Sequence, residues 1–390
     1  MATYNIKNLG SGKYLNINGN YLTSLTNHQE VTQWSGSNKP EQTWVIDTID
    51  TSSTSVGVPI KSYVNQSFSL NIYRATKNCD VYPLALNGGG DGFVYFVPVA
   101  GVTNGYKIIT KSDFSATKHY LSLAANNATN GTNICWAPTN GTNYQVWVLE
   151  TTKYMHVNAN LHYVRIAPSE IDIRYINAAK TSPTDGSYFN AGFFGDYYGC
   201  GTLPVANLLC NLNESVISDA NQTALRGWLC TISGNKLYKN SYNPTGVSTP
   251  ISTFYIDSSN NAYIAQANSV QTTWKCAVSG APIMKNGVIT SITELNDEHW
   301  DPSWKYGTWH GCLAVATSST VGASEFFYVA METTSDDCRT GEAYNIVNSL
   351  NLGIQNAIIL DGGTSFIFKY NGTTRETTGG TRPINNIMYF

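Results

Sequence analysis

The stretch of this chain with the clearest potential for chemistry is Asp361-Gly-Gly-Thr-Ser365, which sets one carboxylate and two hydroxyls beside two glycines. A carboxylate next to a buried strand is costly unless it pairs with another group or acts on a ligand. Glycine has no Cβ, so a ligand can approach its backbone closely. The alternative is an ordinary β-hairpin in which Asp361 bonds its own turn.

Apolar residues on both sides position this stretch. Ala357–Leu360 runs into it and Phe366–Phe368 follows at once, which predicts a buried strand, a tight glycine turn and a second strand. The preceding residues 341–352 have helical spacing with one apolar face. Short alternating segments make up most of the remaining sequence after residue 150. We therefore expect residues 151–390 to form an α+β domain of mixed sheet with few helices.

The first 150 residues contain an internal repeat, which is typical of a symmetric fold. Three similar strand-like segments open the repeats: Lys13–Ile17, Phe68–Ile72 and His119–Leu123. The first and third repeats end in Gln-x-Trp, at residues 42–44 and 145–147, whereas the second has Phe-Val-Tyr-Phe at residues 93–96. Gly, Asn and Ser turns separate the strands and there is no helical period, so we expect an all-β domain over residues 1–150.

These repeats resemble a ricin-B-type β-trefoil lectin, and the resemblance covers essentially residues 1–150. It implies an all-β trefoil of three pseudo-repeats that binds carbohydrate. In that family the Trp of Gln-x-Trp fills the shared core and the Gln bonds backbone. The resemblance thus assigns four residues to the fold: Gln42, Trp44, Gln145 and Trp147.

The resemblance also implies sugar sites made of a polar residue on the first strand and an aromatic residue on the next hairpin. Carried over to this chain, the pairs are Asn16 with Trp34, Asn71 with Tyr82, and Ser122 with Trp136. Galactose-binding members have Asp where this chain has these amides and this hydroxyl, and a carboxylate grips two adjacent sugar hydroxyls more strongly. Ordinary packing is the alternative for Trp34 and Trp136.

Four segments in the second half resemble, in the same order, parts of the phosphodiester glycosidase family. They are Asn190–Phe194, Val278–Gly287, Leu360–Ser365 and Arg382–Phe390. The animal member, the uncovering enzyme, removes N-acetylglucosamine from a phosphodiester on lysosomal glycans, so the resemblance implies hydrolysis of sugar-1-phosphodiesters by residues 151–390. Family members usually carry Arg-Thr where this chain has His310-Gly311. Either His310 replaces the arginine as a pH-dependent phosphate donor, or the domain is inactive.

This reaction suggests a role for each candidate catalytic residue. Arg382 or Arg339 would hold the phosphate bidentately. Ser365 and Thr364 would donate hydrogen bonds to the leaving oxygens. Asp361 would activate water or stabilise a positive sugar centre, and Asn190 would orient the substrate. The alternatives are a salt bridge closing the last strand for Arg382 and a satisfied turn for Asn190.

Composition excludes some partners. The net charge is −3 with a pI of about 6.1, which gives no electrostatic case for nucleic acid or a membrane surface. No segment approaches the about 20 apolar residues of a membrane span, so we expect no membrane insertion. With 13% charged residues, 25 Tyr and 9 Trp, the chain suits sugar binding, although any all-β protein favours Thr, Tyr and Trp.

Localisation and cofactors are weakly indicated. The opening residues show no signal peptide, which leaves a cytoplasmic protein, export by another route, or a mature secreted form. The eight cysteines form no Cys-x-x-Cys motif, and their pairing stays open. Residues 297–301 carry metal-binding types, but a solvated loop is favoured; we expect no metal site and no organic cofactor.

We therefore expect a lectin that binds glycans or glycoconjugates, fused to a hydrolase of sugar-1-phosphodiesters. The lectin would raise the local concentration of substrate. The alternative is a chimerolectin whose C-terminal domain has lost catalysis and serves as a scaffold or as the contact surface of a homodimer.

Overall fold

A computed structural model of the chain describes residues 2–36, 38–51, 57–87, 90–111, 118–179, 181, 183, 186–191, 211–212, 215–216, 229–233, 236–239, 250–267, 273–298, 309–334, 341–378 and 383–390. Within these ranges, the side chains of residues 2, 173–179, 211–239, 296, 361, 364 and 383–386 lie outside the description. The chain divides into two compact units, Met1–Ala159 and Asn160–Phe390. No helix in these ranges is long and apolar enough to cross a membrane.

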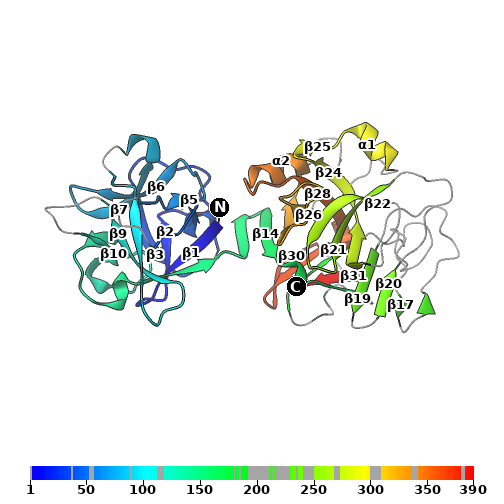
Figure 1. Cartoon of the computed structure of the whole chain (residues 1–390), viewed down its shortest axis with the longest axis horizontal. Helices are drawn as coiled ribbons and strands as arrows, with labels where there is room; N and C mark the ends of the chain where they lie inside the picture. Colours follow the sequence, from blue (N-terminus) through cyan, green and yellow to red (C-terminus); the bar gives the residue numbers. More distant parts are fainter. Residues whose placement is uncertain are drawn as a thin grey trace. The chain divides into compact units, whose positions relative to one another are not determined.

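The first unit is built from short antiparallel strands (Figure 1). They are β1 (Ala2–Asn8), β2 (Tyr14–Ile17), β3 (Gln29–Trp34), β4 (Thr43–Ile46), β5 (Lys61–Ser62), β6 (Phe68–Tyr73), β7 (Asn78–Pro83), β8 (Val94–Pro98), β9 (Gly105–Thr110), β10 (Tyr120–Leu123), β11 (Ile134–Ala137), β12 (Trp147–Thr151) and β13 (Tyr154–Asn158). β1 pairs with both β12 and β4, and β11 pairs with β7, so β1–β12 form one closed network.

The same hairpin occurs three times in this unit, as β2–β3, β6–β7 and β10–β11. Its equivalent cross-strand pairs are Asn16 with Thr32, Asn71 with Asp80, and Ser122 with Cys135. The residues one position earlier are fully buried in a common core: Leu15, Leu70 and Leu121. Alternate residues of a strand face opposite sides, so each repeat turns a leucine inward and its neighbour the other way. The predicted trefoil of three repeats is confirmed.

The two Gln-x-Trp segments hold this core together, as predicted. Trp44 and Trp147 are 0% exposed, and their indole N–H groups donate to the carbonyls of Leu15 at 3.1 Å and Leu121 at 2.8 Å. The amide of Gln145 donates to the Pro138 carbonyl at 2.8 Å. Each large ring is therefore buried with its polar atom satisfied, which avoids the penalty for an unpaired buried donor.

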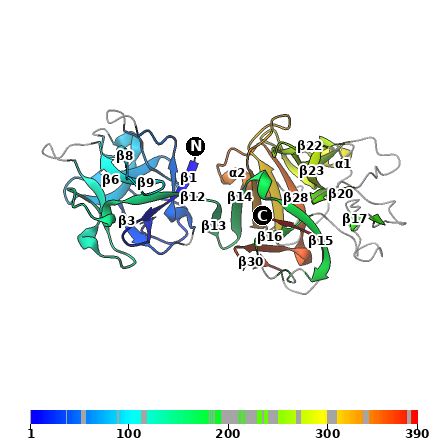
Figure 2. The same cartoon turned by 60° about the horizontal axis from the view of Figure 1, so that its bottom comes forward.

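The second unit contains three larger sheets and a two-stranded one, and its antiparallel strands and the sheet containing β16 and β30 can be followed in Figure 2. One sheet runs in the order β14 (Leu161–Ile166), β27 (Phe326–Glu332), β26 (Trp309–Val315), β28 (Asn356–Gly362), β24 (Ala281–Lys285) and β25 (Val288–Ile289). Another runs in the order β15 (Asp172–Ala179), β31 (Pro383–Tyr389), β16 (Tyr188–Asn190), β29 (Ile367–Tyr370) and β30 (Thr373–Thr377). A third runs in the order β20 (Lys236–Lys239), β19 (Leu229–Ser233), β23 (Trp274–Ser279), β21 (Ile251–Asp257) and β22 (Ala262–Ala267). The two-stranded sheet pairs β17 (Asn211–Leu212) with β18 (Ser215–Val216).

Two α-helices accompany these sheets in the described part of the unit. α2 (Glu342–Ser349) lies where helical spacing predicts it and contacts β24 and β27. α1 (Ile292–Asp297) lies just before the stretch 297–301 that we expect to be a solvated loop, and its last residue, Asp297, is the first residue of that stretch. The pairings given above are antiparallel, so they contain no parallel pair to support the mixed sheet predicted from the sequence.

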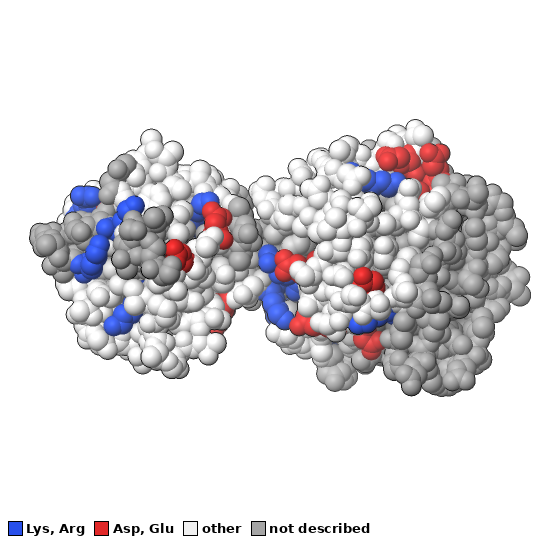
Figure 3. Space-filling view, viewed as in Figure 1, with Lys and Arg blue, Asp and Glu red and all other residues white. Residues whose placement is uncertain are grey.

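The apolar run before Asp361 forms β28, and its residues Ala357–Leu360 are fully buried. Gly280, just before β24, lies so close to β28 that a Cβ there would meet the Ile359 carbonyl oxygen at 2.2 Å. The glycine therefore permits the close approach of two strands. Charged side chains are sparse on the face of the chain in Figure 3, in keeping with the 13% charged content.

Candidate functional site

The first repeat of the trefoil carries an open cavity of about 420 Å³. Its lining consists of Asn16, Asn18, Gly19, Asn20, Trp34, Lys39, Glu41 and Gln42. Asn16 pairs with Thr32 across the β2–β3 hairpin, and Trp34 follows Thr32 by two positions on the same face. The structure thus brings together the first predicted pair, Asn16 and Trp34, at one concave surface.

The polar atoms of Asn16 are held in a defined orientation. Its Nδ2 donates to the Ile17 carbonyl at 2.9 Å and to the Thr32 hydroxyl at 3.2 Å. Its Oδ1 accepts no hydrogen bond from the residues that the structure describes, so it is available to a ligand donor. Trp34 is 47% exposed, which leaves part of a large aromatic ring at the cavity wall.

Two charged residues in this cavity were not singled out from the sequence. Glu41 lies in the short helix η1 (Pro40–Gln42), and its oxygens accept the backbone N–H groups of Tyr21 at 3.2 Å and Leu22 at 3.4 Å. Lys39 donates to Asn20 Oδ1 at 2.5 Å and lies 4.4 Å from the centre of the Tyr21 ring. The signal that could have found Glu41 is its position directly before the Gln of Gln-x-Trp, and Lys39 lies two residues before Glu41.

The second repeat also brings its predicted pair together, but around a buried carboxylate. Asp80, opposite Asn71, accepts a hydrogen bond from Asn71 Nδ2 at 2.6 Å and contacts His28 Nδ1 at 2.6 Å. Asn87 Nδ2 donates to Asn71 Oδ1 at 2.8 Å. Burial raises the pKa of the Asp80 carboxyl, and the contacts with Asn71 and His28 oppose that shift.

Tyr82 of the second repeat stacks against a side chain from the first repeat. The imidazole of His28 lies 4.4 Å from the Tyr82 ring, centre to centre, at an interplanar angle of 25°. It also meets Tyr73 edge-on at 5.0 Å. One face of the Tyr82 ring is therefore in contact with His28.

The third repeat does not bring its predicted pair together. Trp136 is 2% exposed, lies in the core cluster and donates its indole N–H to the Asn71 carbonyl at 3.1 Å. The register gives the reason: Ser122 pairs with Cys135, so Ala137 occupies the position of Trp34 and Tyr82, while Trp136 points to the opposite face. Packing, the alternative considered for Trp136, is what the structure shows.

In the second unit, strand pairing brings the backbone of His310 next to the end of the Asp361 strand. β28 ends at Asp361-Gly362, and Gly362 pairs with His310 of the neighbouring strand β26. His310 is fully buried. Asn190, at the end of β16, is 2% exposed and its Oδ1 accepts the backbone N–H of Ile367 at 3.1 Å. This bond fits the satisfied amide that was the alternative for Asn190.

Two buried hydroxyls lie among these strands. Ser365 and Tyr328 are both 0% exposed, and neither hydroxyl has a hydrogen-bond partner within the described ranges. Burial raises the pKa of Tyr328 well above its usual value, and its ring stacks on Phe189 at 3.7 Å. The side chains of Asp361 and Thr364, and all of Arg382 and Arg339, lie outside the described residues.

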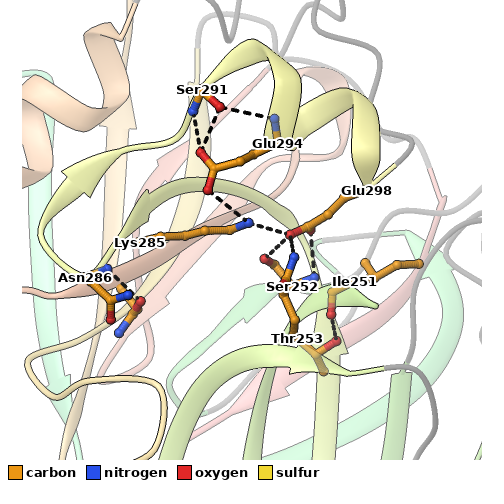
Figure 4. Close-up of polar contacts among 10 residues, drawn as sticks. Ile251, Ser252, Thr253, Lys285, Asn286, Ser291, Glu294 and Glu298 are labelled. Carbon is orange, nitrogen blue, oxygen red and sulfur yellow. Dashed lines mark hydrogen bonds and ion pairs between the residues drawn. The ribbon is translucent and has the colours of Figure 1, made fainter. Parts of the chain in front are cut away.

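Glu298, just after α1, is a buried carboxylate where a solvated loop is expected (Figure 4). It accepts the backbone N–H of Ser252 at 2.7 Å and three further bonds at 2.8 Å, from the Ser252 hydroxyl, Gln266 and Lys285. Figure 4 shows Lys285 extending between Glu298 and Glu294. The distance from Lys285 Nζ to Glu294 Oε1 is 3.8 Å. The paired charges fix α1 to β21 and β24. Nothing in the described part of the chain groups three His, Cys, Asp or Glu as metal ligands.

Comparison with known proteins bears on the first unit. Residues 2–79 match the family model described as ricin-type beta-trefoil lectin domain-like. The first unit is a ricin B-type β-trefoil lectin domain. Domains of this family are carbohydrate-binding lectins. The threefold hairpin register described above agrees with the assignment. Among curated proteins there is no match.

Solved structures similar to the chain include other trefoils. The designed threefold-symmetric protein ThreeFoil is 20% identical with a TM-score of 0.31, covering 38% of this chain and 96% of its own. The C-half of an earthworm R-type lectin, in complex with GalNAc, is 20% identical with a TM-score of 0.29, covering 39% and 100%. The ricin B-like lectin of Macrolepiota procera, in complex with lactose, is 15% identical with a TM-score of 0.30, covering 38% and 95%.

Proposed function

We propose that the lectin domain binds glycans at the cavity of its first repeat. The observation that carries this proposal is the pairing of a half-exposed Trp34 ring with the oriented amide of Asn16 in one cavity of about 420 Å³. An aromatic face packs against the C–H groups of a sugar ring, and amides exchange hydrogen bonds with its hydroxyls. The volume is in the range of pockets that enclose small ligands.

Glycan recognition at this cavity uses different chemistry from the galactose-binding pattern. Asn16 offers an amide oxygen where a carboxylate would be stronger, and the one carboxylate in the lining, Glu41, is already bonded to two backbone N–H groups. Affinity for galactose is therefore expected to be lower than in galactose-binding relatives. The third repeat contributes no stacking face, because Ala137 offers no ring.

A glycan array probed with the full chain tests this proposal. Wild type should bind a defined set of glycans, and Trp34→Ala should lose that binding because the stacking surface is gone. Val97→Ala is the matched control, since Val97 is an exposed apolar residue on β8 of the same domain. Equal binding by wild type and Trp34→Ala would refute the site, and binding of no glycan by wild type would refute the function.

For the second unit we propose hydrolysis of sugar-1-phosphodiesters, by the resemblance of four ordered segments to phosphodiester glycosidases. Two observations support a site near Asp361. The backbone of Asp361-Gly362 lies beside His310, and the buried Ser365 hydroxyl lacks a partner within the described ranges. An unsatisfied buried hydroxyl is costly, and a phosphate oxygen would satisfy it. Arg382 and Thr364 complete the proposed set, with Asn190 as a positioning residue.

Release of sugar from a synthetic N-acetylglucosaminyl phosphodiester tests the hydrolase. Wild type should turn the diester over, and Asp361→Asn should lose most of that activity. Glu325→Gln is the control, because Glu325 is a half-exposed carboxylate paired with Arg165 on the same unit. Turnover unaffected by Asp361→Asn would refute the catalytic assignment. No turnover by a folded wild type would favour the chimerolectin with an inactive C-terminal domain.

A further inference from the structure

Two loop residues occupy equivalent positions in the first and third repeats of the lectin domain. His28 lies three residues before Val31, which pairs with Ile17, and Gly131 lies three residues before Ile134, which pairs with Leu123. Both adopt the left-handed backbone region, with φ of +61° and +79°. Each therefore presents its Cα in the same way to the following repeat.

The two loops also dock in the same way. The N–H of His28 donates to the Val81 carbonyl at 3.0 Å, and the N–H of Gly131 donates to the Gln33 carbonyl at 2.9 Å. Val81 and Gln33 are the residues directly before the aromatic residues of the second and first repeats. The loop of one repeat thus docks on the β-hairpin of the next in both cases.

The side chains at these positions differ in what they leave open. His28 stacks on Tyr82 at 4.4 Å and is held there by Asp80 at 2.6 Å. At Gly131 there is no side chain, although a Cβ would lie 3.5 Å from the Trp34 ring. A histidine at 131 would be in reach of Trp34, as His28 is of Tyr82.

We propose that the residue at this loop position decides which repeats of the lectin domain bind glycan: Gly131 keeps the first site open, and His28 closes the second. This inference rests on the proposed glycan binding and specifies its valency. In the closed second site, His28 occupies the ring face and one oxygen of Asp80, the two features that a sugar would need. With His28 removed, Tyr82 would offer stacking and Asp80 a carboxylate for adjacent hydroxyls.

The test counts lactose bound per full-length chain by equilibrium dialysis. Wild type should bind one equivalent, His28→Gly two, and Gly131→His none. Asp80→Asn in the His28→Gly background should lose the added equivalent, because the amide cannot grip a diol as the carboxylate does. His28→Asn is a second opening variant, since asparagine tolerates the left-handed backbone.

A measurement without sugar accompanies the count. Nitration of Tyr82 by tetranitromethane, read by peptide mass spectrometry, should rise in His28→Gly and His28→Asn because the ring face becomes accessible. The inference is overturned if folded His28 variants gain no lactose over wild type, or if nitration of Tyr82 does not change. If neither wild type nor Trp34→Ala binds any glycan on the array, the proposed lectin site itself is wrong.

Discussion

Replacing Trp136 by alanine should destabilise the lectin domain while leaving its glycan cavity intact. The ring is 2% exposed, and its N–H bonds the Asn71 carbonyl at 3.1 Å. Truncation of a buried tryptophan costs about 3–5 kcal/mol because contacts are lost and a cavity remains. The orphaned carbonyl of Asn71 pushes the loss toward the upper part of that range.

Hydrogen exchange read by mass spectrometry suits this two-unit chain, because peptides of each unit report separately. A loss of about 3–5 kcal/mol corresponds to about two to four orders of magnitude faster exchange in strands that open with the domain. Trp34→Ala is the matched control. Its ring is 47% exposed, and it should cost about 1 kcal/mol or less while removing glycan binding.

The two variants should therefore have opposite effects on exchange protection and on glycan binding. Trp136→Ala should lose protection and keep glycan binding under conditions where the domain stays folded, and Trp34→Ala should do the reverse. If protection in Trp136→Ala equals that of wild type, or if glycan binding is lost while protection is kept, the strand register that places Trp136 in the core is wrong.

Further predictions concern charge, pH and close packing. Lys285→Met should destabilise the second unit by about 3 kcal/mol, because the substitution leaves the buried Glu298 carboxylate without its cation. Hydrogen exchange in β21 and β24 should be faster than in wild type, and unchanged exchange would contradict this prediction. Burial and a hydrogen bond to Glu150 raise the pKa of Tyr14 to about 12 from 10.0. The unfolded chain then ionises first, so stability should fall as pH rises from about 10 to 12, and thermal melts of Tyr14→Phe should lack that component. Gly280→Ala should destabilise the second unit by at least about 1–3 kcal/mol, since the added methyl group meets the backbone of β28; a melting temperature equal to that of wild type would argue against the contact.

Sequence reasoning succeeded where local pattern alone decides structure. Three hairpins around one core are predicted by the recurring leucines, Leu15, Leu70 and Leu121, and by the Gln-x-Trp segments. The reason is that apolar residues alternate with polar ones along each strand. The pairing of Asn16 with Trp34 came from the resemblance to ricin-B-type lectins, and the hairpin register explains why both residues line one cavity.

It failed where the answer depends on register or on distant contacts. Nothing local in Ile-Cys-Trp-Ala shows whether Trp136 or Ala137 faces outward, and a shift by one residue exchanges core and surface. His28 meets Asp80 across 52 residues, which no spacing rule connects. Glu298 resembled part of a solvated loop because its partners Ser252, Gln266 and Lys285 come from three separate strands.

The docking of His28 on the second repeat and of Gly131 on the first has a consequence for how trefoil repeats evolve and can be engineered. The sequence repeats, but recognition occurs at the junction between one repeat and the next. Duplicating, deleting or transplanting a single repeat would alter two sites at once. The repeat carries its own aromatic ring, and its loop supplies the residue that lies near the ring of the next repeat. Grafting a working site onto another trefoil therefore requires the hairpin of one repeat together with the loop of the repeat before it.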